Sequence, residues 1–270
     1  MHDISPKVVR TGTLLDFKKA GRKFSALTSY DSLTSGIFDE AGIDVLLVGD
    51  SAADNVLGYE TTLPITVDEM IPFGRAVSRA AQRALVVVDM PFGSYESGPE
   101  DALQNAIKIM KLSGAGAVKL EGGLRSVAQI KALVTAGIPV MAHIGFTPQS
   151  VHSFGGAKVQ GRGDSAQALI DDALAVQEAG AFSVVLELVP ASLATEVSKM
   201  LDIPTIGIGA GSGTDGQILV WTDFAGLYPG KTRKFVKQYA NLRDTLLEAA
   251  TRYRKEVAES DFPNADNSHE

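Results

Sequence analysis

One pattern recurs along the chain: a short apolar run ends in a polar or charged residue. Residues 45–48 are four consecutive apolar residues, followed by Gly49, Asp50 and Ser51. Such a run predicts a strand that is buried on both faces, as in a parallel sheet. Further runs of the same kind lead to Asp89, Lys119 and Glu121, His143, and Glu187.

The carboxyl ends of parallel strands share one face of an α/β fold, and ligands bind at that face. Five strand ends should therefore bring their polar side chains into one pocket. Lys119 and Glu121 alternate with Leu120, so both should point to the same side of their strand, which in a barrel is the interior. The predicted pocket contains Asp50, Ser51, Asp89, Lys119, Glu121, His143 and Glu187.

Eight predicted strands alternate with helices over most of the chain. The strands are residues 24–28, 45–48, 85–89, 117–121, 139–144, 183–188, 204–208 and 217–220. The helices are residues 32–41, 67–83, 100–113, 126–136, 164–180 (with Asp164 as the N-cap), 192–200 and 234–258. This order favours an α/β (β/α)8 TIM barrel over an open doubly wound sheet.

The ends of the chain differ from the repeating part. Residues 1–23 read as a polar arm with a short helix, which is expected to plug the N-terminal end of the barrel. No linker divides the chain, so a single barrel domain is expected over residues 1–270. The tail at 259–270 is acidic and polar and is expected to be flexible.

Composition excludes several classes of function. The chain has no cysteine, which excludes disulfides, thiolate metal sites and a cysteine nucleophile. A net charge of −7 without a Lys/Arg cluster disfavours nucleic acid as a partner. No apolar run approaches the roughly 18 residues that span a membrane, and no signal peptide is evident, so a cytoplasmic location is expected.

Three carboxylates in the predicted pocket indicate a metal site. Asp50, Asp89 and Glu121 would repel one another there unless a cation compensates, and a hard cation such as Mg²⁺ suits oxygen ligands. The alternative is that each Asp merely caps the following helix.

The remaining pocket residues allow both structural and chemical roles. Lys119 is expected to grip a substrate carboxylate or an enolate oxygen, the alternative being a structural ion pair with Glu121. His143 suits a ligand contact or a buried core histidine equally. Glu187 ends an apolar strand and is the candidate general base, the alternative being a salt-bridged Glu.

The segment 145–163 is rich in Gly, Ser and Gln and shows neither helical nor strand periodicity. A loop of this length in a compact domain is usually functional or disordered. It is predicted to be a mobile lid that closes over the site. The glycine-rich segment 206–215 resembles a phosphate loop only weakly, and tight turning at the rim of the barrel explains it better.

The strand ends and their loops resemble the ketopantoate hydroxymethyltransferase family, and the matches extend from about residue 24 to 230. The matching stretches are residues 27–31, 49–51, 62–66, 89–95, 119–123, 143–150, 158–162 and 206–211. Two departures are minor: residues 52–55 read Ala-Ala-Asp-Asn, and Thr214 stands where a Cys is often seen.

The resemblance implies the first step of pantothenate biosynthesis. A hydroxymethyl group would pass from 5,10-methylenetetrahydrofolate to 3-methyl-2-oxobutanoate, giving 2-dehydropantoate, with Mg²⁺ as cofactor. It implies that Asp50 and Asp89 hold the metal with Glu121 near it, and that Ser51, Asp89, Lys119 and His143 lie at the substrate. It also implies that Glu187 removes the C3 proton, and that the enzyme is a cytoplasmic homo-oligomer, typically a decamer.

Three alternatives remain open from the sequence. One is a Mg²⁺-dependent C–C lyase of the isocitrate lyase or phosphonomutase type, although such enzymes usually need a Cys-bearing lid or a phosphonate loop. Another is a class I aldolase that uses Lys119 as a Schiff base. The third is a barrel that only binds keto acids, which would not need a base at Glu187.

Overall fold

A computed structural model describes residues 8–230 and 232–269. The described residues form two compact units, one ending at Val220 and one beginning at Trp221. The expectation of one domain over residues 1–270 stays a prediction.

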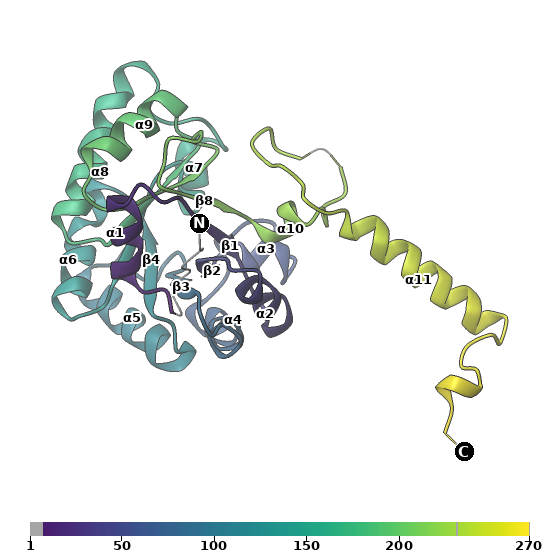
Figure 1. Ribbon diagram of the computed structural model, residues 1–270. Coiled ribbons are helices and arrows are strands. Elements are labelled where there is room, and N and C mark those ends of the chain that lie inside the picture. The colour runs from purple at the N-terminus through teal and green to yellow at the C-terminus, as the bar shows by residue number, and fades with distance from the viewer. Residues whose placement is uncertain (1–7, 231, 270) are drawn as a thin grey trace. The chain divides into compact units, whose positions relative to one another are not determined.

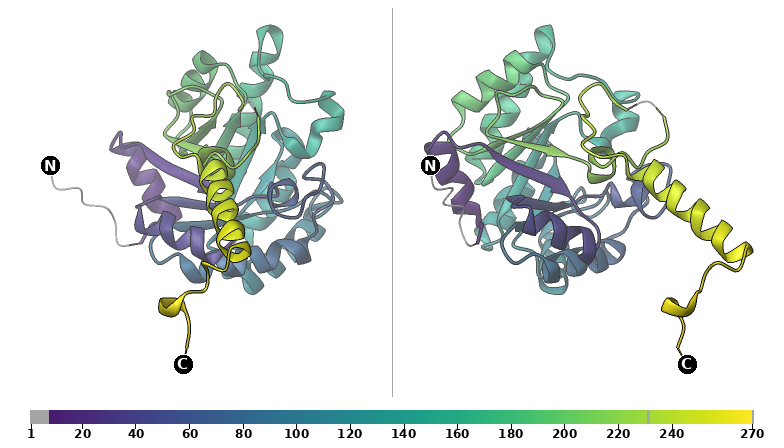
Figure 2. Two further views of the ribbon diagram at one scale, coloured as in Figure 1. Left: turned by 90° about the vertical axis from the view of Figure 1, so that its right-hand side faces the viewer. Right: turned by 45° about the vertical axis from the view of Figure 1, so that its right-hand side comes forward.

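The first unit is a closed barrel of eight parallel strands, and this confirms the predicted fold class. The strands run in sequence order around the barrel, and Figures 1 and 2 show them enclosed by helices. They are β1 (Phe24–Thr28), β2 (Val45–Val48), β3 (Leu85–Asp89), β4 (Ala117–Glu121), β5 (Val140–Gly145), β6 (Ser183–Glu187), β7 (Thr205–Ile208) and β8 (Gly216–Leu219).

The register of the strands aligns the polar residues that end them. Asp89 on β3 is level with Lys119 on β4, and Glu121 is level with His143 on β5. Glu187 on β6 is level with Gly145. Because the strands are parallel and neighbours in the barrel, these side chains are adjacent at one end of it.

The predicted helices of the barrel unit are all present, with bounds that agree to within a few residues, and two short helices, α3 and α7, are present in addition. Together they are α1 (Thr11–Lys19), α2 (Ser32–Glu40), α3 (Ala52–Asn55), α4 (Val67–Ala80), α5 (Pro99–Ser113), α6 (Val127–Thr135), α7 (Val151–Phe154), α8 (Ala166–Glu178) and α9 (Ala191–Met200). A Thr66–Glu69 capping box begins α4, and Asp31 caps α2 through the N–H groups of Leu33 and Thr34.

Three short helical elements were not predicted, and one predicted helix cap was wrong. The helix α3 lies directly after residue 51, and the segment 145–163, which shows no periodicity in the sequence, contains the 3₁₀ turn η2 (Pro148–Ser150) and α7. Asp164 does not cap α8, because it lies inside the 3₁₀ turn η3 (Gly163–Ser165) that precedes the helix. Short helical turns of this kind carry no periodicity that a sequence pattern can reveal.

The N-terminal end of the barrel is closed by α1, as predicted. Leu14 and Phe17 of this helix are buried in the same cluster as Phe24, Val45 and other residues near the start of the strands. The covering helix therefore contributes directly to the core of the barrel.

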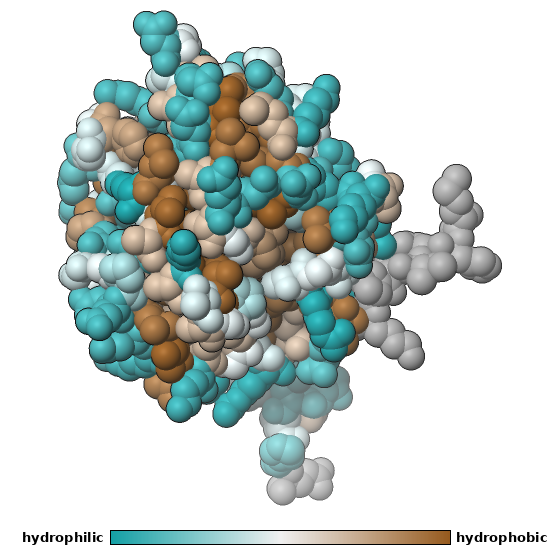
Figure 3. Space-filling view, turned by 90° about the vertical axis from the view of Figure 1, so that its left-hand side faces the viewer, coloured by the Kyte–Doolittle hydropathy of each residue, from teal (hydrophilic) through white to brown (hydrophobic). Residues whose placement is uncertain are grey.

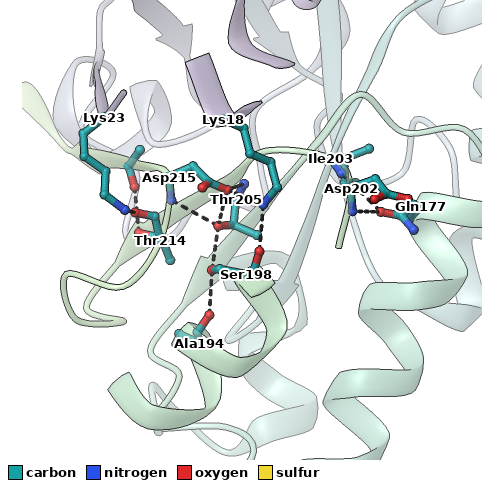
Figure 4. A network of polar contacts seen from close by, with 11 residues as sticks. Lys18, Lys23, Gln177, Ala194, Ser198, Asp202, Ile203, Thr205, Thr214 and Asp215 are labelled. Atoms are coloured by element: carbon teal, nitrogen blue, oxygen red, sulfur yellow. Dashed lines mark hydrogen bonds and ion pairs between the residues drawn. The ribbon is translucent and has the colours of Figure 1, made fainter. Parts of the chain in front are cut away.

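Polar contacts tie the same helix to the segment before β8 and to the end of α9 (Figure 4). Lys18 Nζ donates to Asp215 Oδ2 at 2.8 Å and to the Ser198 carbonyl at 2.7 Å. Asp215 Oδ2 also accepts from the backbone N–H of Thr205 at 2.8 Å. Each group of this network is partnered, as the burial of polar groups requires.

The outside of the molecule shows hydrophobic and hydrophilic side chains interspersed on the face drawn in Figure 3. Among the described helices, none is both long and apolar enough to cross a membrane.

The second unit contains α10 (Trp221–Phe224), α11 (Leu242–Ala258) and a 3₁₀ turn, η4 (Ala265–Asn267). The stacked rings of Phe224 and Tyr239, 5.1 Å apart, hold its first part together. The long helix was predicted to begin near residue 234 but begins at Leu242. No residue of α11 is buried, and its exposed large apolar side chains are Leu242, Leu246, Leu247, Tyr253 and Val257.

Candidate active site

The ionisable residues predicted to meet at the carboxyl ends of the strands are all buried there. Asp50 lies two residues beyond β2, Asp89 ends β3, and Glu121 and Glu187 end β4 and β6. Lys119 and His143 lie within β4 and β5, and their side chains contact carboxylates of the same cluster. The six side chains therefore meet in one buried place. Their relative exposures lie between 1% and 7%.

Asp89 joins three strands of the site. Its Oδ1 forms an ion pair with Lys119 Nζ, and its Oδ2 accepts the backbone N–H of Asp50 at 3.0 Å. The alternative of a Lys119–Glu121 pair is not the arrangement found. Residues directly opposite in neighbouring strands lie closer than residues two apart on one strand, so register decides the partner.

His143 lies between two carboxylates. Its Nδ1 is 3.3 Å from Glu121 Oε1, and its Nε2 is 3.3 Å from Glu187 Oε2. Both contacts are within ion-pair distance. Their geometry is not that of hydrogen bonds, so within the described residues the two imidazole nitrogens and Glu121 Oε1 have no hydrogen-bond partner. The contacts are therefore electrostatic in character, and they depend on the charge of the imidazole.

The ionisation of the site follows from these neighbours. Burial and the Lys119 charge oppose protonation of His143, but Glu121 and Glu187 outweigh them and raise its pKa to about 9. Burial would lower the pKa of Lys119, yet Asp89, Glu121 and Asp50 raise it above its ordinary value. Both groups are therefore cations near neutral pH.

The carboxylates of the site respond differently from one another. Burial, then the charges of Asp89 and Glu121, raise the pKa of Asp50 to about 8. Burial also raises the pKa of Asp89, although Lys119 opposes it. Burial would raise the pKa of Glu121 as well, but His143 and Lys119 lower it below its usual value. Negative charge is thus under-compensated at Asp50 and Asp89.

Ser51, beside Asp50, is hydrogen-bonded to Tyr30, a residue that the sequence patterns did not single out. The hydroxyls of Tyr30 and Ser51 are 2.7 Å apart, and Tyr30 is buried after β1. Tyr30 belongs to the stretch 27–31 that carried the family resemblance. Its position directly beyond a predicted strand was the signal that could have identified it.

Gln149 and Tyr95 are two further residues of the site that were missed. Gln149 donates from its side chain to Asp50 Oδ2 at 2.9 Å and from its backbone N–H to Glu121 Oε2 at 3.0 Å. Tyr95 Oη is 2.5 Å from Gln149 Oε1. Both residues belong to the stretches that carried the resemblance, which was the only signal for them.

The carboxylates of the site suit a hard divalent cation that is bound directly by Asp50 and Asp89 better than one bound directly by Asp50, Asp89 and Glu121. Within the described residues, no group of three His, Asp or Glu side chains is arranged to hold a metal ion. Asp50 and Asp89 are two buried carboxylates under mutual repulsion, which suits a cation bound by one or two carboxylates with its remaining positions left to water or substrate. Glu121 already faces His143 and the Gln149 N–H, so it would act on such a cation through water.

Comparisons with known proteins agree on one family. Residues 8–265 match the family model described as ketopantoate hydroxymethyltransferase. A 3-methyl-2-oxobutanoate hydroxymethyltransferase of Leifsonia xyli subsp. xyli is 62% identical over 264 residues, which cover 98% of this chain and 95% of that protein. One of Corynebacterium efficiens is 57% identical over 269 residues, with 100% of both chains covered.

Solved structures with the same fold are more distant in sequence. Phosphonopyruvate hydrolase in complex with oxalate and Mg²⁺ is 13% identical, with a TM-score of 0.60 over 96% of this chain and 93% of that one. 2,3-Dimethylmalate lyase, of the PEP mutase/isocitrate lyase superfamily, is 17% identical, with a TM-score of 0.60 over 97% and 92%. At these identities the similarity concerns the fold alone.

Proposed function

This chain belongs to the ketopantoate hydroxymethyltransferase family and catalyses the first step of pantothenate biosynthesis, and we propose that it does so with Mg²⁺ held by Asp50 and Asp89. We propose further that 5,10-methylenetetrahydrofolate supplies the one-carbon unit.

The observation that carries the metal proposal is the contact between Asp50 and Asp89. The Asp50 N–H is bonded to Asp89 Oδ2, and burial, followed by the charges of neighbouring carboxylates, raises the pKa values of both carboxyl groups. When bound, Mg²⁺ supplies Lewis-acid polarisation of the substrate's keto oxygen. Glu121 would contribute through water.

Lys119 is proposed to act as a fixed cation. Its ammonium group is paired with Asp89 and is kept protonated by three carboxylates. A Schiff base needs the neutral amine, so this environment opposes the class I aldolase alternative. A protonated Lys119 suits the stabilisation of a substrate carboxylate or of negative charge developing on the enolate oxygen. Ser51, oriented by Tyr30, would hydrogen-bond to the substrate.

Glu187 is proposed as the general base that takes the C3 proton. His143 is its neighbour, with Nε2 at 3.3 Å, and the pKa of about 9 keeps this imidazole protonated near neutral pH. A protonated imidazole cannot accept a proton, whereas a carboxylate at its side can. His143 would then hold Glu187 in place and stabilise its charge before the proton is transferred. The C3 carbon of the enolate would then form a bond to the one-carbon unit, whose C–N bonds to the folate break, and water would supply the hydroxyl group of the product.

A coupled assay tests the proposal directly. With Mg²⁺, the protein should convert 3-methyl-2-oxobutanoate and methylenetetrahydrofolate to 2-dehydropantoate, and EDTA should abolish the reaction until Mg²⁺ is restored.

Asp89→Asn should weaken Mg²⁺ binding, with partial rescue of activity by excess metal. Unchanged Mg²⁺ affinity in both Asp50→Asn and Asp89→Asn would refute the metal assignment. Borohydride with the keto acid should trap no adduct at Lys119.

We also propose that the protein is a cytoplasmic homo-oligomer, a decamer by resemblance to its family. The exposed apolar side chains of α11 support an assembly, because a helix with no buried residue gains stability chiefly from packing against another surface.

A further inference from the structure

A directed chain of hydrogen bonds leads from the backbone of β4 to the Asp50 carboxylate. The Glu121 N–H donates to Tyr95 Oη at 3.2 Å, and the Tyr95 hydroxyl meets Gln149 Oε1 at 2.5 Å. Gln149 Nε2 then donates to Asp50 Oδ2 at 2.9 Å and to the Met90 carbonyl at 3.1 Å. Tyr95 and Gln149 are 3% and 5% exposed, so water does not compete freely with these contacts.

The two ends of this chain determine its direction. A backbone N–H can only donate, so the Glu121 N–H makes the Tyr95 oxygen an acceptor and leaves its proton for Gln149 Oε1. A backbone carbonyl can only accept, so Met90 requires the nitrogen of the Gln149 amide. A flipped amide would place Oε1 against two acceptors. Asp50 therefore always receives an N–H donor at Oδ2.

The backbone of Gln149 adds a second attachment. Its N–H donates to Glu121 Oε2 at 3.0 Å, so one residue contacts both Asp50 and Glu121. The residue stands in η2, directly after Pro148, whose fixed φ limits the conformations of this turn. Gln149 thus links the loop after β5 to the ends of β2, β3 and β4.

We infer that Gln149 is a positioning residue that fixes the Asp50 carboxylate for metal binding, and that Tyr95 acts through Gln149 by fixing the orientation of its amide. The inference rests on the proposed role of Asp50 as a metal ligand. A donor on Oδ2 holds the carboxylate in one orientation, and partners of ligating carboxylates do the same in other metal sites.

The test measures metal affinity, separately from turnover. Mn²⁺ binding to the full-length protein is titrated by electron paramagnetic resonance for the wild type, Gln149→Leu, Tyr95→Phe and the double variant. Gln149→Leu should raise the Kd for Mn²⁺ by about 10- to 100-fold, the usual effect of losing a partner of a metal ligand. Tyr95→Phe should raise it by a smaller factor, and the double variant should be no weaker than Gln149→Leu alone.

A matched control uses the other buried tyrosine of the site. Tyr30→Phe removes a hydroxyl that contacts Ser51 and should leave the Kd for Mn²⁺ unchanged. Thermal unfolding verifies that each variant is folded. Tyr95→Phe retains the ring, so it tests the chain even if Gln149→Leu does not fold.

The outcomes separate this inference from the proposed function. If Asp50→Asn raises the Kd but Gln149→Leu and Tyr95→Phe do not, the positioning role is wrong and the metal site stands. Additive effects in the double variant would show that Tyr95 does not act through Gln149. If Asp50→Asn also leaves the Kd unchanged, the metal assignment fails and the positioning role fails with it.

Discussion

At the scale of single residues, burial of opposite and like charges sets the pH response of the metal-free protein. Folding raises the pKa of His143 from 6.5 to about 9, because Glu121 and Glu187 outweigh burial and the charge of Lys119. It raises the pKa of Asp50 from 3.8 to about 8 through burial and the charges of Asp89 and Glu121, which Lys119 and Gln149 only partly oppose. In both cases the folded state holds the proton more tightly. The stabilisation is complete below the ordinary pKa and is lost as the pH rises through the raised value.

We therefore expect the melting temperature of the protein in EDTA to fall as the pH rises from 6.5 to 9. The slope should be smaller in His143→Asn, because that variant lacks one of the two groups. His152→Asn, which changes an exposed histidine, is the control and should retain the slope. Mg²⁺ should stabilise the protein more at pH 8.5 than at pH 6.5, since binding requires ionised Asp50. Stability that rises with pH in EDTA would contradict the assignment.

The strand-end residues could be predicted from the sequence because each stands at the end of an apolar run, where parallel topology determines its place. The pairing of Lys119 with Asp89 could not be predicted, because it depends on the register between β3 and β4. Tyr95 and Gln149 were missed for a different reason. They lie in turns beyond the strands, and no periodicity determines where such a turn directs a side chain.

At the scale of elements, the segment after β5 divides into an anchored and an accessible part. Gln149 is buried and tied to the site, whereas Lys158 and Arg162 are exposed. The predicted lid over residues 145–163 therefore reduces to the part after Ser150, and its mobility stays a prediction. Closure of this part would shield the enolate from water.

Limited proteolysis measures that closure. Trypsin should cleave after Lys158 or Arg162 in the free protein, and keto acid with Mg²⁺ should slow the cleavage. Lys158→Gln combined with Arg162→Gln should remove both sites and serves as the control for cleavage elsewhere. Equal rates with and without ligands would show that this segment does not close over the site.

The glycine-rich segment 206–215 turns tightly, as its sequence was interpreted, since Gly209 and Gly211 have φ values of 63° and 75°; close packing is a second reason for its glycines. A Cβ at Gly211 would lie 2.4 Å from Ala191 Cβ, and one at Gly213 would lie 2.0 Å from Thr195 Oγ1. Both neighbours belong to α9, which therefore packs closely against this segment. Small residues are required there by space, without any phosphate.

At the scale of the whole molecule, the alternation of apolar runs with helical segments was enough to predict the closed barrel and the plug formed by α1. The start of α11 was misplaced by several residues, although Asn241, which stands at its N-cap, is a residue type that commonly begins a helix. Helix ends of this kind are determined by contacts such as the Tyr239 N–H with the Phe224 carbonyl, at 2.8 Å.

The exposed apolar residues of α11 lead to a prediction about assembly. Leu246→Glu combined with Tyr253→Glu should lower the mass found by size-exclusion chromatography with light scattering, because charges would replace apolar side chains at a contact. Glu248→Lys combined with Arg252→Glu changes charged residues of the same helix and is the control. A wild-type protein that elutes as a monomer would refute the proposed oligomer.

Exchange of the C3 hydrogen of 3-methyl-2-oxobutanoate into D₂O, followed by nuclear magnetic resonance without folate, tests the central claim most directly. The wild type with Mg²⁺ should catalyse this exchange. Glu187→Gln should bind Mg²⁺ and keto acid but exchange about 10²- to 10⁴-fold more slowly, as expected for loss of a general base. Exchange at the wild-type rate in Glu187→Gln, together with its loss in His143→Asn, would contradict the account and identify His143 as the base.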